Sequence, residues 1–213
     1  MKWVCTVCGY VYEGPEAPAE CPICHVPADK FKAMDEEKSW AAEHVVGIAQ
    51  GVDPEIVEDG PTFRENAMIK ARAVAALLPD AIVLADDSGL VIDALNGEPG
   101  VYSARYLGTD TPYSVKNAEL IHRMEGVPEE KRSARFVCAI AAVLPDGREL
   151  ETEGRIEGRI GYEPRGTFGF GYDPIFYVPE IGCTTGEIPE TEKNKISHRG
   201  RALERMKEEL KKL

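Results

Sequence analysis

The sequence predicts an α/β protein, with helices packed on a mixed sheet, preceded by a small metal-knuckle module. From residue 62 onward, short apolar runs with strand character alternate with segments whose apolar residues recur at helical spacing. Ahead of these segments, two Cys-x-x-Cys pairs lie within the first 24 residues. Residues 1–60 hold 4 Lys, no Arg and 12 acidic residues, whereas all 13 Arg follow them. This shift in composition predicts a boundary near residue 60.

The bulk composition narrows the classes of protein that fit. With 213 residues, 43% hydrophobic and 29% charged, the chain has enough apolar mass for a globular core. A net charge of −12 argues against partners such as nucleic acid or an anionic membrane. Its longest apolar runs are about half the ~18–20 residues that a membrane span needs, and the first residues lack an apolar signal core. We therefore expect a cytoplasmic protein.

Four cysteines form a set with metal-ligand spacing: Cys5, Cys8, Cys21 and Cys24. Each Cys-x-x-Cys pair can turn two thiolates toward one ion, and two pairs complete a tetrahedral site of four sulfurs. The alternative, two disulfides, is disfavoured in a cytosolic chain. Iron and zinc both suit such a site. Cys138, within an apolar run, is expected to be a core residue.

The residues around these cysteines resemble the rubredoxin-like module of rubrerythrins. The shared features are the run Cys-Thr-Val-Cys-Gly-Tyr at 5–10, Cys-Pro-x-Cys at 21–24, and Phe31. The resemblance implies a redox-active Fe(S-Cys)4 centre over residues 1–35 that exchanges one electron with a redox partner. Residues 36–57 resemble the linker and helix that open a rubrerythrin bundle.

The expected elements after the boundary follow from local signals. Thr62 and Glu65 fit a capping box that starts a helix. Residues 81–85 form an apolar strand, Asp86 to Gly89 are expected to be the turn that ends it, and residues 90–92 resume a strand. Further along we expect a helix at 112–125, a buried strand at 135–144, a hairpin turn at Pro-Asp-Gly, a strand at 149–160 and a final helix after Ser197.

Three motifs carry candidate chemistry. Asp86 and Asp87 can hold Mg²⁺ and orient a water, although such a turn is also common in solvated loops. The glycines at 169–174 let backbone approach a flat ligand, with Phe170 or Tyr172 stacking on it; a plain turn with core aromatics is the alternative. A basic segment at the last helix can bind phosphate, or can be an ordinary solvated helix end.

Together these motifs resemble the inosine triphosphate pyrophosphatase family, the XTP/dITP diphosphatases. The segments that carry the resemblance are ADDSGL at 85–90, PGVYSARY at 99–106, FGFGYDPIF at 168–176 and EKNKISHRGRAL at 192–203. The resemblance implies a homodimeric enzyme, with residues 58–213 as its domain. Its expected reaction is Mg²⁺-dependent hydrolysis of ITP, dITP or XTP, purine nucleoside triphosphates, to monophosphate and pyrophosphate.

The resemblance also assigns roles to residues. Asp87 is the expected general base for the attacking water. The expected Mg²⁺ ligands are Glu58, Asp86 and Asp87. The expected substrate-binding residues are Lys70, Ser88, Phe170, Gly171, Tyr172, Asp173, Lys193, His198 and Arg199.

One departure from the family leaves other functions open. The family opens with a strand that ends in Thr/Ser-x-Asn-x-x-Lys, which grips the triphosphate, and residues 1–57 contain no such motif. We therefore expect an enzyme domain without its usual first strand and helix. The alternatives are an electron-transfer or metal-binding protein with an inactive pyrophosphatase-like scaffold, and a recombination product without a joint function.

Overall fold

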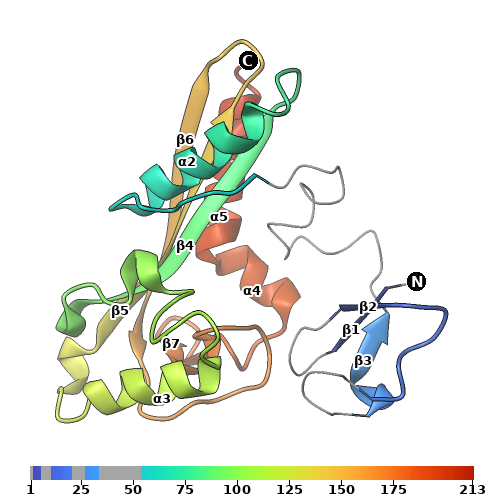
Figure 1. Ribbon diagram of the computed structural model, residues 1–213. Coiled ribbons are helices and arrows are strands. Elements are labelled where there is room, and N and C mark those ends of the chain that lie inside the picture. Colours follow the sequence, from blue (N-terminus) through green and yellow to red (C-terminus); the bar gives the residue numbers. More distant parts are fainter. Residues whose placement is uncertain (1, 6–10, 21–26, 34–53) are drawn as a thin grey trace. The chain divides into compact units, whose positions relative to one another are not determined.

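The computed structural model describes residues 2–5, 11–20, 27–33 and 54–213. The chain divides into two compact units, Met1–Gln50 and Gly51–Leu213 (Figure 1). Each unit has its own sheet.

The first unit contains a small antiparallel sheet of three strands. Its strands are β1 (Lys2–Cys5), β2 (Val11–Glu13) and β3 (Phe31–Ala33), with β1 in the middle, and the 3-10 turn η1 (Ala28–Lys30) precedes β3. The side chain of Phe31 is buried. Cys8, Cys21 and Cys24 lie outside the described residues, and only the backbone of Cys5 is described, at the end of β1. The four-cysteine metal site therefore stays a prediction.

The second unit is built on a five-stranded sheet. In spatial order its strands are β4 (Val83–Ile92), β5 (Ser133–Val143), β6 (Glu149–Ile160), β7 (Phe176–Val178) and β8 (Cys183–Thr184). Every neighbouring pair is antiparallel, so the described strands lack the expected mixture of directions. The tight turn between β5 and β6 explains one such pair, because a short hairpin joins only antiparallel strands. The α/β class, with helices on the sheet, is confirmed.

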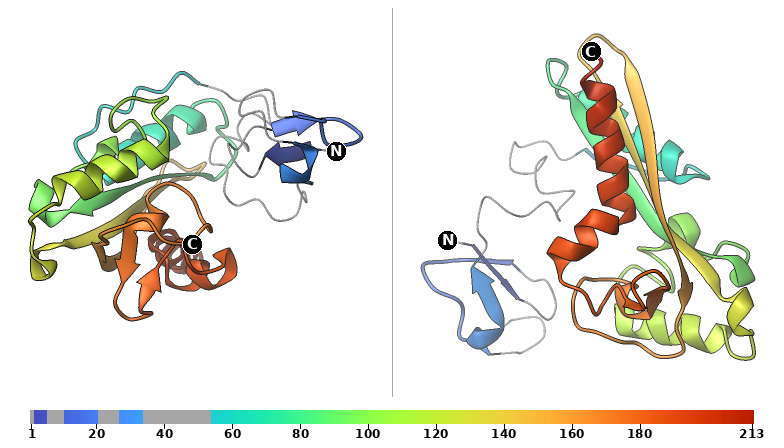
Figure 2. Two further views of the ribbon diagram at one scale, coloured as in Figure 1. Left: turned by 90° about the horizontal axis from the view of Figure 1, so that it is seen from below. Right: turned by 180° about the vertical axis from the view of Figure 1, so that it is seen from behind.

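Two helices cover opposite faces of this sheet. Helix α2 (Phe63–Ala75) lies on one face and helix α5 (His198–Leu210) on the other, as the front and rear views show (Figures 1 and 2). The described part of this unit also contains two further helices, α3 (Tyr113–Arg123) and α4 (Glu190–Ile196), and four 3-10 turns: η2 (Asp93–Leu95), η3 (Gly100–Tyr102), η4 (Glu129–Lys131) and η5 (Asp173–Ile175).

Strand β5 is buried on both faces because it supplies side chains to both helical layers. Ala139 and Ala141 pack toward α2, whereas Cys138 and Ile140 pack with Met206 of α5. This alternation is the period of two that a strand imposes on its side chains. The expectation that Cys138 is a core residue is confirmed, since it is fully buried.

Most of the expected elements are found, but the prediction of a turn from Asp86 to Gly89 is wrong. Strand β4 runs without interruption, and each of its residues from Val83 to Ile92 pairs with β5. The non-local ladder to β5 outweighs the turn preference of Asp, Ser and Gly. Gly89 instead lets the Gly100 backbone lie close to β4, because a Cβ at Gly89 would lie 2.5 Å from the Gly100 carbonyl oxygen.

Local signals at the helix starts are largely confirmed. The Glu65 backbone N–H donates to Thr62 Oγ1 at 3.2 Å, as a capping box requires. The Glu65 carboxylate accepts from the Thr62 hydroxyl rather than from its backbone N–H. Ser197 caps α5 through Gly200 N at 3.0 Å, and the same residue separates α4 from α5. Lys193 therefore lies on α4, not at the start of the last helix.

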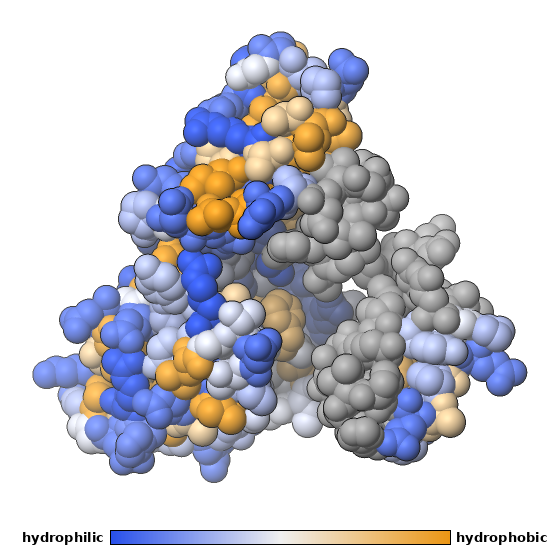
Figure 3. Space-filling model, viewed as in Figure 1, coloured by the Kyte–Doolittle hydropathy of each residue, from blue (hydrophilic) through white to orange (hydrophobic). Residues whose placement is uncertain are grey.

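The exposed surface of the second unit includes an apolar patch near the start of β4. Leu77, Ile82 and Leu84 are about half exposed there, and apolar surface is visible in this region (Figure 3). Among the described strands, β4 pairs with β5 alone, so it forms one end of the sheet. Within the part of the chain that the structure describes, no helix is long and apolar enough to cross a membrane.

Candidate active site

The candidate residues around β4 form two clusters, one on each face of the strand. Successive side chains on a strand point to opposite faces, so Asp87 points toward α2 and Asp86 toward α5. We call the first group the Asp87 cluster: Glu58, Asn66, Lys70 and Asp87. The second group, the Asp86 cluster, contains Asp86, Ser88, Cys138 and Arg199.

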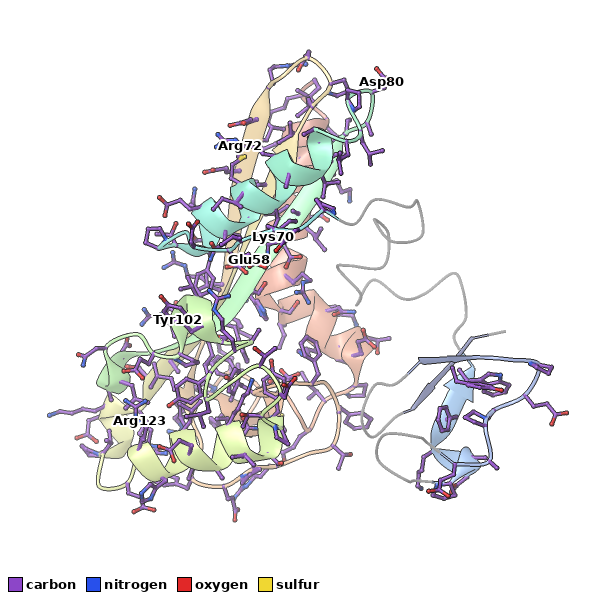
Figure 4. The ribbon with its side chains drawn as sticks, viewed as in Figure 1. Glu58, Lys70, Arg72, Asp80, Tyr102 and Arg123 are labelled. Carbon is purple, nitrogen blue, oxygen red and sulfur yellow. The ribbon has the colours of Figure 1, made fainter. Side chains whose placement is uncertain are left out.

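The Asp87 cluster is organised around one ammonium group. Lys70 Nζ lies 3.0 Å from Asp87 Oδ1 and 3.1 Å from Glu58 Oε2, and all three side chains are mostly buried. Helix α2 also presents Asn66, which lies one turn before Lys70. The Asn66 Nδ2 atom lies 3.4 Å from Asp87 Oδ2. Lys70 and Glu58 lie side by side next to β4 (Figure 4). The structure thus brings together residues that are up to 29 positions apart.

The environment of Asp87 makes its carboxylate a stronger base than an exposed one. Burial raises the pKa of Asp87, and the nearby Glu58 charge acts in the same direction. Lys70 and the Asn66 amide oppose this rise, since both stabilise the ionised carboxylate. A carboxylate with a raised pKa and a nearby cation is suited to accept a proton from water.

Glu58 and Asp87 also fit a magnesium ion. Carboxylate oxygens are the donors that Mg²⁺ prefers, and the ion is often held by one or two carboxylates plus substrate phosphates. Both carboxylates already contact one cation, the Lys70 ammonium, so they are close enough to share a charge. Among the described residues, no group of three or more His, Cys, Asp or Glu side chains is suited to a metal ion.

Asp86 does not join this pair. Its Oδ2 accepts from Arg199 Nη2 at 3.0 Å and from Ser88 Oγ at 3.1 Å, and the Cys138 thiol lies 3.5 Å away. Burial raises the pKa of Asp86, while the Ser88 and Cys138 hydrogen bonds lower it. The expected sharing of one cation by Asp86 and Asp87 does not fit this geometry, because the strand directs their carboxylates to opposite faces.

The glycine-rich segment forms a loop with one exposed ring. Phe170 is 64% exposed, whereas Tyr172 and Asp173 are buried. The Asp173 carboxylate accepts from Phe170 N and Thr185 Oγ1, each at 2.8 Å, and pairs with Lys193. Its oxygens are therefore occupied by protein donors, so Phe170 is the member of the set that is placed to contact a ligand.

The same loop depends on two glycines with left-handed backbone. Gly169 and Gly171 have φ values of 72° and 65°, which only glycine adopts without strain. The Tyr172 hydroxyl donates to Ser103 O at 2.7 Å, which ties the loop to the PGVYSARY segment. Lys193 Nζ lies 4.9 Å from the centre of the Phe170 ring, so a cation stands beside the exposed aromatic face.

His198 is held as a neutral ring. Its imidazole stacks on Phe136, with ring centres 4.9 Å apart and planes inclined by 15°. Burial, together with the Lys193 charge, lowers the pKa of His198 to about 3. One ring nitrogen therefore carries a hydrogen and the other accepts at neutral pH.

Two residues of the site are not among those predicted from the sequence. Asn66 contacts Asp87, and Arg105 Nη2 donates to the Glu58 carbonyl oxygen at 3.0 Å. Asn66 could have been found from its spacing, since it lies four residues before Lys70 on the same helix face. Arg105 lies within a motif that was recognised, but its contact with residue 58 is not encoded in local spacing.

Comparison with protein families gives two matches. The model of the Ham1 family matches residues 28–209, and that of the rubrerythrin, rubredoxin-like domain matches residues 3–32. The first match begins upstream of residue 58, where the motifs suggested that the enzyme domain starts.

Curated relatives and solved structures agree with the larger match. A protein of Geobacter sulfurreducens named dITP/XTP pyrophosphatase is 52% identical over 157 residues, 74% of this chain and 78% of the relative. A protein of the same name from Bacillus licheniformis is 49% identical over 178 residues, 83% and 89% of the two chains. The Staphylococcus aureus Ham1 protein superposes with a TM-score of 0.72 at 38% identity, covering 78% of this chain and 84% of that one. A HAM1 protein from Coxiella burnetii gives 0.70 at 46% identity, covering 75% and 82%.

Proposed function

The chain belongs to the Ham1 family, and on that premise we propose that it hydrolyses deaminated purine nucleoside triphosphates to a monophosphate and pyrophosphate. The substrates are ITP, dITP and XTP. The observation that carries the proposal is the Asp87 cluster, in which a buried carboxylate with a raised pKa lies 3.0 Å from the Lys70 ammonium. Asp87, Lys70 and Glu58 are also residues to which the sequence resemblance assigns the chemistry.

Asp87 acts as the general base of the proposed reaction. It accepts a proton from water while the water oxygen forms a bond to the α-phosphorus and the bond to the pyrophosphate oxygen breaks. Mg²⁺, when bound, neutralises charge on the phosphates, and Glu58 and Asp87 are the residues that would hold it. Lys70 keeps the two carboxylates in place and supplies positive charge where a phosphate must approach.

We assign recognition of the base to Phe170, Lys193 and His198. The exposed ring of Phe170 stacks on the purine, with Lys193 beside it. Neutral His198 donates its one ring N–H to the 6-oxo group of the purine. Adenine carries an amino group at this position, which is itself a donor and cannot accept that hydrogen bond. Gly171, Tyr172 and Asp173 shape the loop that holds Phe170.

Phosphate binding is shared between cations from several elements. Residues 1–57 lack the family's Thr/Ser-x-Asn-x-x-Lys sequence. We propose that the enzyme domain works without the strand and helix that this sequence joins in the family. Lys70 and Arg199 are the cations that we assign to the triphosphate, with Ser88 as a further polar contact and Asp86 orienting Arg199. Homodimerisation, expected from the family, is likewise proposed.

A comparison of substrates tests this proposal. Initial rates with Mg²⁺ are measured for dITP and XTP against dATP, which has a 6-amino group. We expect kcat/KM to be at least 100-fold higher for the 6-oxo substrates, because an unpaired buried donor is costly. Equal rates for dATP and dITP, or no pyrophosphate from any of them, would contradict the proposal.

A second function is favoured by the match of residues 3–32 to the rubrerythrin, rubredoxin-like domain. We propose that Cys5, Cys8, Cys21 and Cys24 bind one iron ion that exchanges an electron with a redox partner. The purified full chain should then contain about one iron and show visible absorption that bleaches with dithionite. A colourless protein with one tightly held zinc would count against electron transfer.

A further inference from the structure

Asn66 is a buried amide that contacts two separate parts of the Asp87 cluster. Its side chain is 1% exposed and lies in the first turns of α2. Its Oδ1 accepts from the Gly60 backbone N–H at 2.9 Å, and its Nδ2 lies 3.4 Å from Asp87 Oδ2. A single side chain therefore joins the segment before α2 to the middle of β4.

The orientation of this amide is fixed by its partners. Gly60 N is a donor, so the Asn66 oxygen must face it, and the amino group must then face the Asp87 carboxylate. The chain at Gly60 lies so close that a Cβ there would be 2.7 Å from Asn66 Oδ1. The sequence meets this requirement with the one residue that lacks a Cβ.

The segment that Asn66 anchors also carries Glu58. This segment is also held by Arg105 Nη2, which donates to the Glu58 carbonyl oxygen at 3.0 Å, and by Lys70 Nζ, 3.1 Å from the Glu58 carboxylate. Asn66 is the side chain in the described cluster that bonds both this segment's backbone and Asp87. Loss of the amide would remove the hydrogen bond to Gly60, in the segment that carries Glu58, and the hydrogen bond to Asp87.

We propose that Asn66 is a positioning residue that sets the placement of Asp87 relative to Glu58 for the hydrolytic step. This inference rests on the proposed function, because the Glu58–Asp87 pair matters only if it serves that chemistry. Both polar atoms of the Asn66 side chain have protein partners, so we assign it no contact with substrate. It acts through Asp87, by restricting the rotation of the carboxylate, and through Gly60, by restricting the segment that carries Glu58.

A purely structural role predicts a different pattern. If Asn66 only stabilised the start of α2, its removal would lower the melting temperature and leave the kinetics of the folded enzyme unchanged. It would also act independently of Asp87. A positioning role requires that the effect of removing Asn66 disappear once Asp87 has gone.

A double-mutant cycle separates these roles. Asn66→Ala, Asp87→Ala and the double variant are compared with the wild type in kcat, KM and melting temperature. We expect Asn66→Ala to lower kcat by about 10- to 100-fold with KM changed less than threefold. In the Asp87→Ala background the same change should alter the residual kcat less than twofold.

A matched control removes a buried hydrogen bond elsewhere. Thr152 Oγ1 donates to Ala202 O at 3.0 Å, between β6 and α5, so Thr152→Val should lower the melting temperature without lowering kcat. An equal loss of kcat in Thr152→Val, or an equal fold-loss from Asn66→Ala with and without Asp87, would overturn the positioning role.

The melting temperatures keep the test independent of turnover. If Asn66 holds Asp87, Asn66→Ala should lower the melting temperature less in the Asp87→Ala background than in the wild type. Additive shifts would overturn the contact whatever the activity. Absence of turnover in the wild type, with non-additive shifts, would instead reject the proposed function and retain the link between the two residues.

Discussion

Asp86 and Asp87 are adjacent in the chain, yet their carboxylates contact different helices on opposite faces of β4. Asp87 pairs with Lys70 of α2, whereas Asp86 pairs with Arg199 of α5, in each case at 3.0 Å. The strand therefore divides two acids that look equivalent in sequence into a catalytic candidate and a residue that orients a cation.

The two acids should respond differently to the same isosteric change. Asp87→Asn removes the proposed base, so we expect kcat for dITP to fall by at least 100-fold. Asp86→Asn releases Arg199 from its ionic partner and should chiefly raise KM. Steady-state pyrophosphate release measures both, and equal losses of kcat in the two variants would argue against the division of roles.

Lys70 should control the pH at which activity begins. The ammonium lowers the pKa of Asp87, so Lys70→Met should raise that pKa further. Because the base must be ionised to act, the acidic limb of the kcat/KM profile should move to higher pH. The control is Lys195→Met, which removes an exposed lysine paired with Glu192. An unmoved acidic limb in Lys70→Met would refute this coupling.

The exposed ring of Phe170 should bind substrate without stabilising the fold. Stacking on a base contributes about 1–3 kcal/mol, so Phe170→Ala should raise KM by about 5- to 150-fold. Its melting temperature should stay close to that of the wild type, since the ring is 64% exposed. Phe168, which is 50% exposed in the same segment, provides the matched control. A KM that rises equally in Phe168→Ala would show that the effect is not specific to Phe170.

His198 should make the protein less stable as the pH falls. Its folded pKa of about 3 lies below the ordinary value of 6.5, so its contribution is complete above pH 6.5 and is lost as the pH falls toward 3. In His198→Gln, the free energy of unfolding should therefore depend less steeply on pH over this range. Glu125 raises the pKa of the exposed His122. Replacing His122 should therefore shift the slope of the unfolding free energy against pH in the opposite direction. Urea denaturation between pH 4 and 7 measures both variants, and equal slopes in wild type and His198→Gln would contradict the neutral ring.

Local signals predicted much of the fold. Strand β6 has the expected bounds, and Ser197 caps α5 as its position before an amphipathic helix suggests. These features depend on residues a few positions apart, where periodicity and capping chemistry act directly.

The misassigned and overlooked features depend on distant partners. Asp86 to Gly89 carry turn-forming residues, but the ladder to β5 holds them in a strand. The contact of Tyr172 and Asp173 with substrate stays a prediction, while the structure shows both buried and Asp173 bonded to Thr185 and Lys193. Local spacing carries no information on which distant side chain satisfies a buried carboxylate.

The central claim is that Asp87 activates a water that attacks the α-phosphorus of a deaminated purine triphosphate. Hydrolysis of dITP in ¹⁸O-labelled water, followed by mass spectrometry of both products, tests this claim most directly. We predict one ¹⁸O atom in the monophosphate, none in the pyrophosphate, and at least 100-fold less of both products with Asp87→Asn. Label in the pyrophosphate, release of orthophosphate in its place, or an undiminished rate with Asp87→Asn would contradict the account.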